Sequence, residues 1–106
     1  MIVSIIGLGY IGLPTAAVLA SKDIKVVGVD VSQHVVDTIN QGKIHIIEPG
    51  LDALVREAVQ KNHLKAVINP EKADVFMIAV PTPFKGNHEP DLSYIRLAAK
   101  AIAPVL

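Results

Sequence analysis

Six residues near the amino terminus, Gly7-Leu8-Gly9-Tyr10-Ile11-Gly12, follow the pattern G-x-G-x-x-G. Glycines at this spacing leave a turn without bulky side chains, so its backbone N–H groups can approach a phosphate closely. The pattern alone is weak, because glycine-rich turns also occur by chance. Here it lies between the β-branched apolar run 2–6 and the Ala- and Leu-rich stretch 13–21, a predicted strand and a predicted helix. This context predicts a dinucleotide-binding turn.

Each glycine of the turn has its own predicted role. Gly7 permits the tight turn, Gly9 leaves room for a pyrophosphate against the backbone, and Gly12 lets the helix pack closely against the sheet. The backbone N–H groups of Tyr10 and Ile11 are expected to face the pyrophosphate, while their side chains cover it or simply pack. The helix dipole adds to the attraction for negative charge.

Asp30 ends the second predicted strand at the distance from the turn where the fingerprint carries its acidic residue. A carboxylate there can accept hydrogen bonds from both hydroxyls of the adenosine ribose, and its charge repels a 2′-phosphate. Val31 and Ser32 follow it, with no arginine to bind that phosphate, so NAD is favoured over NADP. The alternative is an ordinary strand–helix turn in which Asp30 caps a helix.

Thr82 is a further candidate for contact with the cofactor. It lies in Pro81-Thr82-Pro83, directly after the apolar run 75–80, and the two prolines fix its backbone. The carboxyl ends of the strands in such a sheet border the crevice where ligands bind, so Thr82 is placed to offer its hydroxyl there. A rigid turn with a solvated threonine explains the position equally well.

The histidine and carboxylate side chains do not combine into a metal site or an acid–base pair. The histidines show no metal-ligand spacing: His34, His45, His63 and His88. Three carboxylates have no evident partner: Glu48, Glu89 and Asp91. His34 lies one helical turn beyond Asp30, but a helix surface is its favoured interpretation. His63 is expected at a helix end, where a positive charge suits the dipole. No metal and no catalytic residue is predicted on this chain.

The elements that position these residues alternate between strand and helix. We expect strands at 2–6, 25–29, 64–68 and 75–80, helices at 13–21, 32–40 and 51–59, and a last helix capped by Asp91 with Leu92, Ile95, Ala99 and Ile102 on one face. This order predicts an α/β fold, a partial Rossmann doubly wound parallel sheet with strand order 3-2-1-4. A complete fold of this kind has six strands, so the sheet is expected to be truncated before the fifth strand. The run 75–80 would then be an apolar edge strand, which favours self-association.

Composition excludes several classes of protein. The chain has 106 residues, enough for one domain, and 51% of them are hydrophobic, too many for a disordered protein. Ten Lys and Arg balance ten Asp and Glu, so the basic excess of a nucleic-acid binder is missing. There is no cysteine, which excludes a disulfide, a cysteine-bound zinc and a thiol nucleophile on this chain. Short apolar runs and the absence of a signal sequence predict no membrane contact and a cytoplasmic location.

The whole sequence resembles the UDP-glucose/GDP-mannose dehydrogenase family. The shared segments follow the family's order: 7–16 (GLGYIGLPTA), 28–30 (GVD), 48–51 (EPGL) and 80–83 (VPTP). Two further stretches, 42–49 (GKIHIIEP) and 83–91 (PFKGNHEPD), resemble the members that act on UDP-N-acetyl-D-mannosamine more than those that act on UDP-glucose.

The resemblance implies an NAD-dependent oxidation of the C6 alcohol of a nucleotide sugar to a carboxylate, in two steps. In the family a cysteine holds the intermediate as a thiohemiacetal and then a thioester, and the mannosamine product feeds bacterial surface polysaccharides. Tyr10, Ile11, Asp30 and Thr82 are then expected to contact NAD. Many members carry lysine where His34 stands, which puts an adenosine-side contact in doubt.

The resemblance also implies that residues 1–106 are an incomplete NAD-binding domain, without the catalytic and substrate domains. A UDP-sugar would bind through those missing domains, the protein is expected to be a homo-oligomer, and this chain alone is not expected to be catalytically competent. Three alternatives stay open: a fragment of a UDP-glucose 6-dehydrogenase, a stand-alone NAD(H)-binding module, and a truncated or decayed product with little binding.

Overall fold

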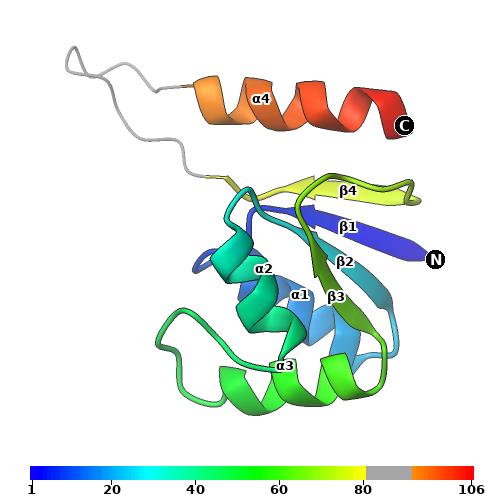
Figure 1. The fold of residues 1–106 in the computed structure, drawn as a ribbon. Coiled ribbons are helices and arrows are strands. Elements are labelled where there is room, and N and C mark those ends of the chain that lie inside the picture. Colours follow the sequence, from blue (N-terminus) through cyan, green and yellow to red (C-terminus); the bar gives the residue numbers. More distant parts are fainter. Residues whose placement is uncertain (81–91) are drawn as a thin grey trace.

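A computed structural model describes residues 1–80 and 92–106, and residues 81–91 lie outside the described part. The chain forms one parallel sheet of four strands in the order β3-β2-β1-β4, with helices packed against it (Figure 1). The predicted α/β class and the predicted strand order are confirmed. No helix within the described residues is long and apolar enough to cross a membrane.

The element bounds agree with the predicted ones to within a few residues. The strands are β1 (Ile2–Ile6), β2 (Lys25–Val29), β3 (Leu64–Val67) and β4 (Val75–Ile78), and the helices are α1 (Gly12–Ser21), α2 (Gln33–Asn40), α3 (Leu51–Gln60), α4 (Ser93–Ile102) and the 3-10 turn η1 (Ala103–Val105). The third and fourth strands end earlier than the predicted residues 68 and 80. Ser32 is the N-cap of α2, as predicted, and its side chain accepts a hydrogen bond from the Val35 N–H.

Helices α1, α2 and α3 cover one face of the sheet, and α4 covers the other (Figure 1). The larger core lies on the first face and includes the fully buried Ile5, Leu13 and Val55. The core under α4 is smaller, with five buried residues: Ile6, Val27, Val29, Ala98 and Ile102. The sheet is therefore packed much more heavily on one face than on the other.

The buried face of α4 agrees with the predicted one only in part: Ile102 is buried and Ile95 is half-buried, as that face required. Ala98 and Ile102, one turn apart, are buried, whereas Leu92 and Ala99 are exposed. The helix carries apolar residues on two sides, so the sequence pattern alone did not determine which side faces the sheet. The N-cap of α4 is Leu92, one residue after the predicted cap Asp91, so the predicted cap is wrong by one position. Asp91 itself lies outside the described residues.

A short segment, residues 68–74, connects β3 to β4 without a helix. Parallel strands usually need a dozen or more residues for such a crossover. The Lys65 side chain points to the α4 face, because its neighbours Leu64 and Ala66 lie in the opposite core. Its Nζ lies 2.9 Å from Oε1 of Glu71, so the crossover passes over the α4 face of the sheet.

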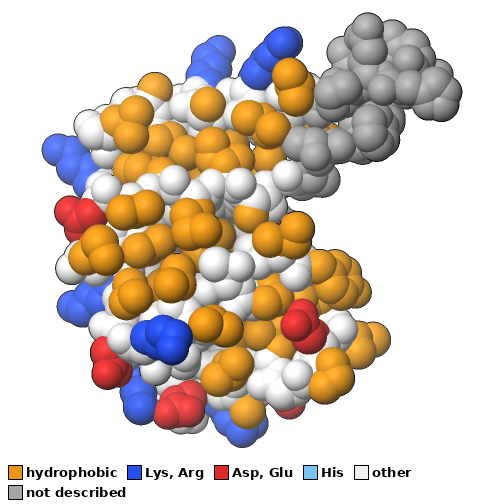
Figure 2. All heavy atoms as spheres, turned by 180° about the vertical axis from the view of Figure 1, so that it is seen from behind, with side chains coloured by type: hydrophobic (Ala, Val, Ile, Leu, Met, Phe, Trp, Pro, Cys, Tyr) orange, Lys and Arg blue, Asp and Glu red, His pale blue; other side chains and the backbone are white. Residues whose placement is uncertain are grey.

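β4 forms an exposed edge of the described sheet. It pairs with β1 only, and the side chains of Val75, Met77 and Ile78 are each about two-fifths exposed. Hydrophobic side chains gather on the side of the molecule seen in Figure 2. An apolar edge strand at 75–78 is therefore present, as the sequence predicted.

Candidate functional site

The glycine turn joins β1 to α1 at the carboxyl edge of the sheet. The Gly7 N–H donates to the Val29 carbonyl oxygen at 2.7 Å, which holds the start of the turn against the end of β2. Gly7 has φ +99°, and a Cβ there would lie 2.6 Å from the Ala79 carbonyl oxygen. Only glycine fits this position, on both backbone conformation and space.

Gly9 and Gly12 differ in what surrounds them. A Cβ on Gly12 would overlap the carbonyl oxygen of Gly7, so Gly12 lets the first turn of α1 fold back onto the glycine turn itself. A Cβ on Gly9 would meet nothing within 4 Å. The missing side chain at Gly9 therefore serves no packing purpose in the described structure, and it leaves an open space over the backbone.

Four consecutive N–H groups of the glycine turn have no hydrogen-bond partner in the described part of the chain. Among the described residues, the amides of 9–12 donate no hydrogen bond, whereas Leu13 N–H donates to the Gly9 carbonyl oxygen at 3.1 Å. Ile11 stands at the N-cap of α1 without a side-chain cap, and Pro14 in the first turn has no N–H to satisfy. Open amides at the positive end of a helix attract an anion.

The side chains of Tyr10 and Ile11 extend into solvent, with exposed fractions of 68% and 75%. Large apolar side chains at a turn are costly to leave in water, so they offer surface to a ligand or to another part of a protein. Both residues thus present open backbone amides and unpacked side chains at the same edge.

Asp30 faces the glycine turn. Its Oδ2 accepts a hydrogen bond from the Leu8 N–H at 3.1 Å, and its Oδ1 accepts one from the Ser32 N–H at 3.0 Å. The half-buried carboxylate thus joins the end of β2 to the turn after β1. The first turn of α2 is capped by Ser32, so the alternative interpretation of Asp30 as the helix cap is wrong.

Leu8 and Gly28 form a contact that the sequence interpretation missed. Leu8 is fully buried beneath the turn, and a Cβ on Gly28 would lie 2.7 Å from a methyl carbon of Leu8. Gly28 therefore makes room for the side chain that supports the glycine turn from below. The glycine next to last in a strand was the available signal, because glycine in a strand interior often marks a close approach.

The remaining candidates lie elsewhere. Thr82 and His88 fall outside the described residues. His34 is exposed on α2, as expected, and His45 is half-buried with its Nδ1 unpartnered among the described residues. His63 follows the end of α3, as predicted, with Nδ1 3.7 Å from Asp23 Oδ1. Within residues 1–80 and 92–106 no three histidine, aspartate or glutamate side chains are grouped to hold a metal ion.

Comparison with known proteins gives a consistent set of relatives. Residues 1–106 match the family model for the NAD-binding domain of the UDP-glucose/GDP-mannose dehydrogenase family. The chain is 67% identical over 105 residues to a UDP-N-acetyl-D-mannosamine dehydrogenase of Campylobacter jejuni, covering 98% of this chain and 26% of that protein. It is 66% identical over 104 residues to an NDP-N-acetyl-D-galactosaminuronic acid dehydrogenase of Ralstonia nicotianae, covering 98% of this chain and 25% of that protein.

A solved structure of a dehydrogenase has the same fold over this part of its chain. The UDP-N-acetyl-mannosamine dehydrogenase Cap5O of Staphylococcus aureus superposes with a TM-score of 0.97 at 40% identity, over all of this chain and 26% of that one. The chain spans about a quarter of the length of the relatives it matches.

Proposed function

The chain belongs to the UDP-glucose/GDP-mannose dehydrogenase family, in the part that binds NAD, and from this premise we propose which of its residues hold the cofactor. The proposed contacts are Gly7, Gly9, Tyr10, Ile11, Gly12, Asp30 and Thr82. The observation that carries the proposal is the open space at Gly9 beside the unpartnered amides of residues 9–12. A cofactor pyrophosphate fits there by charge and by the absence of a side chain.

Asp30 is proposed to bind the adenosine ribose. Each carboxylate oxygen has two lone pairs, and each accepts one hydrogen bond from the protein backbone, so both keep acceptor capacity for a ribose hydroxyl. The negative charge disfavours a 2′-phosphate, which supports NAD over NADP. Bound NAD supplies the hydride acceptor, and the residues of this chain hold and orient it.

Two substitutions test the proposed site on this chain. Gly9→Val places a side chain in the open space, where its Cβ meets no other atom within 4 Å, so the free energy of unfolding should change little while NAD binding is lost. Asp30→Ala should weaken NAD binding about tenfold, because a charge-assisted hydrogen bond is removed. Calorimetric titration with NAD and the shift of melting temperature measure both effects.

Asp37→Ala is the matched control, since Asp37 is an exposed aspartate on α2 whose side chain accepts a hydrogen bond from Gln33. It should leave NAD binding unchanged. Equal binding by the wild-type chain and the Gly9→Val variant would remove the pyrophosphate from this turn and end the proposal.

For the whole protein we propose oxidation of UDP-N-acetyl-D-mannosamine to the corresponding uronate, for the synthesis of surface polysaccharide. The 67% identity to a dehydrogenase of that name supports this substrate. The 66% identity to a galactosaminuronic acid dehydrogenase supports a second candidate, a sugar of different stereochemistry with the same acetamido group. Oxidation of an alcohol to a carboxylate removes four electrons, so each sugar should reduce two NAD.

The test is an assay of the full-length protein with both acetamido sugars and with UDP-glucose, following NADH by absorbance. Two NADH for each UDP-N-acetyl-D-mannosamine would support the first candidate. Preference for a galactosamine sugar or for UDP-glucose would replace it. This chain holds no cysteine, so a covalent thioester step would depend on residues outside it, and the isolated chain should show no turnover.

We further propose that residues 1–106 act as one incomplete NAD-binding domain and that the protein is a cytoplasmic homo-oligomer. The exposed apolar strand β4 supports self-association of this chain. A cytoplasmic location fits a nucleotide cofactor and a nucleotide-sugar substrate, which are made and used there. Light scattering gives the oligomeric state, and cell fractionation gives the location.

A further inference from the structure

A cavity of about 310 Å³ lies at the amino edge of the sheet, the edge opposite to the glycine turn. Its residues come from the starts of β1, β2 and β3 and from the crossover segment: Ile2, Lys25, Val26, Val27, Asn62, His63, Leu64, Lys65, Glu71 and Lys72. This volume lies at the lower end of the range for small-molecule sites, about 300 to 1,000 Å³.

The short crossover creates this cavity. Val27 belongs to the core under α4, so Lys25, two residues earlier in the strand, points to the same face. Lys65 lies on that face as well, and its ion pair with Glu71 fixes the crossover above it. A helix in place of the seven-residue crossover would cover this part of the sheet. The extended segment instead leaves a hollow between itself and the starts of β2 and β3.

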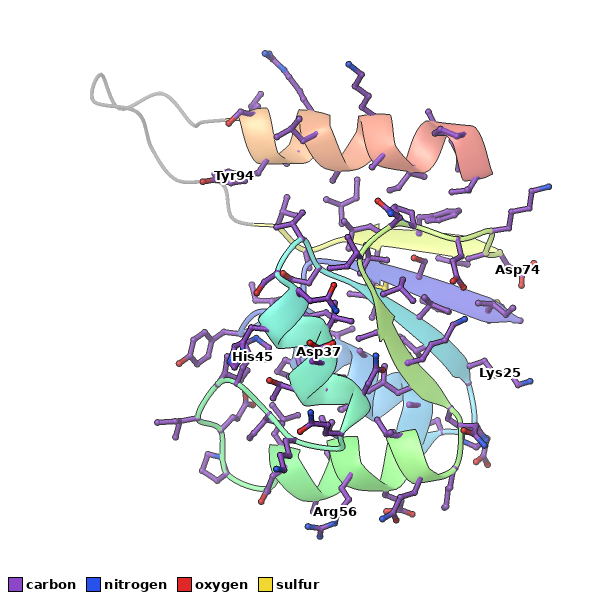
Figure 3. All side chains as sticks on the ribbon, in the orientation of Figure 1. Lys25, Asp37, His45, Arg56, Asp74 and Tyr94 are labelled. Atoms are coloured by element: carbon purple, nitrogen blue, oxygen red, sulfur yellow. The ribbon has the colours of Figure 1, made fainter. Side chains whose placement is uncertain are left out.

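Positive charge dominates the lining. Lys25, Lys65 and Lys72 contribute three ammonium groups, and Glu71 is the single carboxylate. Glu71 is already paired with Lys65. Lys25 and Lys72 make no ion pair with any described residue. Figure 3 shows Lys25 at the beginning of β2, at the amino edge of the sheet.

The walls add polar and apolar contacts. His63 forms part of one wall, and its buried Nδ1 atom lies 3.7 Å from Oδ1 of Asp23, outside the cavity lining. Ile2 and Val27 give an apolar floor. A chain that is neutral overall thus collects, around one small hollow, two lysines that make no ion pair with a described residue.

We propose that this cavity is a second ligand site, separate from the cofactor site, for a small molecule that carries a phosphate group. A phosphate dianion is attracted by the unpaired ammonium groups of Lys25 and Lys72 more strongly than a carboxylate is, because it concentrates two negative charges on one small group. The apolar floor at Ile2 and Val27 accepts the body of the molecule. Because the glycine turn lies at the opposite edge of the sheet, occupation of this cavity does not displace NAD.

The test uses pyrophosphate as the probe, with the 106-residue chain saturated with NAD so that the glycine turn is filled. Pyrophosphate is added at low ionic strength while amide resonances are followed by ¹H–¹⁵N NMR. Saturable shifts are expected for residues 25–27, 63–65 and 71–73, and not for residues 8–13. Citrate is the comparison ligand, since it has similar charge but only carboxylates; equal binding of citrate would overturn the phosphate assignment.

The double variant Lys25→Gln with Lys72→Gln removes the unpaired charges and should weaken pyrophosphate binding about tenfold or more. The matched control is Lys43→Gln with Lys100→Gln, two exposed lysines that do not line the cavity. The control should bind as the wild type does. Absence of saturable shifts at the cavity, shifts confined to the glycine turn, or equal weakening by both pairs would overturn the proposal.

Discussion

The two edge strands of the sheet, β3 and β4, differ in whether their outward backbone groups are hydrogen-bonded. At β3 the outward backbone groups of Ala66 are satisfied by a side chain: Asn40 Nδ2 donates to the Ala66 carbonyl oxygen at 2.9 Å, and the Ala66 N–H donates to Asn40 Oδ1 at 2.8 Å. The carboxamide of Asn40 thus takes the place of a peptide group in a further strand. At β4 no such side chain is present among the described residues, and the strand is exposed.

This difference shows which edge is complete. A closed edge cannot accept another strand without losing hydrogen bonds it already has, whereas an open apolar edge gains by pairing. Growth of the sheet, by further chain or by a second copy, is therefore expected at β4 and not at β3.

The largest expected effect compares the packing beneath the two edges. Leu64 in β3 is 3% exposed, so Leu64→Ala should lower the free energy of unfolding by about 3 kcal/mol. Met77 in β4 is 40% exposed, and Met77→Ala should cost less than about 1 kcal/mol. Urea unfolding followed by circular dichroism measures both. Equal losses would show that the two edges are packed alike.

The second expected effect follows from removing the closure of the β3 edge. Asn40→Ala deletes two hydrogen bonds to Ala66 and should cost about 2 kcal/mol, with faster exchange of the Ala66 amide. Gln33→Ala is the control on the same helix, because it loses only an exposed hydrogen bond to Asp37 and should cost less than about 0.5 kcal/mol. If the Ala66 amide exchanged at the same rate in both variants, Asn40 would not close this edge.

The third expected effect concerns pairing at the open β4 edge. Met77→Lys brings like charges together when two copies pair through β4, so self-association should weaken about tenfold while stability changes little. Val18→Lys places the same charge at an exposed position of α1 and should leave association unchanged. Sedimentation equilibrium measures both. Association that survives Met77→Lys would assign the contact to another surface.

The smallest expected effect concerns an ion pair on α3, away from both edge strands, and it gives a reference for the stability changes expected at the edges. On α3, Nζ of Lys61 lies 2.8 Å from Oε1 of Glu57. The hydrogen bond from Lys61 and the positive charge of Lys61 lower the pKa of Glu57 below its usual 4.5. A lowered pKa means that the pair stabilises the fold above about pH 4.5, and that this contribution is lost as the pH falls through the lowered value. Glu57→Gln should differ slightly from wild type at neutral pH and not at all in strong acid, by thermal unfolding at several pH values.

Local sequence patterns predicted much of this molecule. The four strands, the glycine turn and the position of Asp30 follow from residue types at short spacing, because strand burial and turn geometry are local requirements. The closure by Asn40 joins residues 26 positions apart, and no local pattern indicates it. For the Leu8 side chain beneath Gly28, the glycine within a strand signals a close approach, but nothing local indicates which side chain makes it.

Helix α4 shows a second feature that the sequence pattern does not determine, the side of the helix that faces the sheet. Tyr94 and Leu97 are exposed although apolar, while the smaller Ala98 is buried. Two apolar faces on one helix leave its rotation undetermined, and packing against β4 selects the face. The cavity at the amino edge was equally unpredictable, because it depends on how a seven-residue crossover lies over the sheet.

The hydrogen bond from the Leu8 amide to the Asp30 carboxylate is made within the protein itself, between the loop after β1 and the end of β2. The entropy of fixing the turn is therefore shared with folding. At the proposed cofactor site, a dinucleotide would then have less backbone to immobilise than it would at a turn without such a contact.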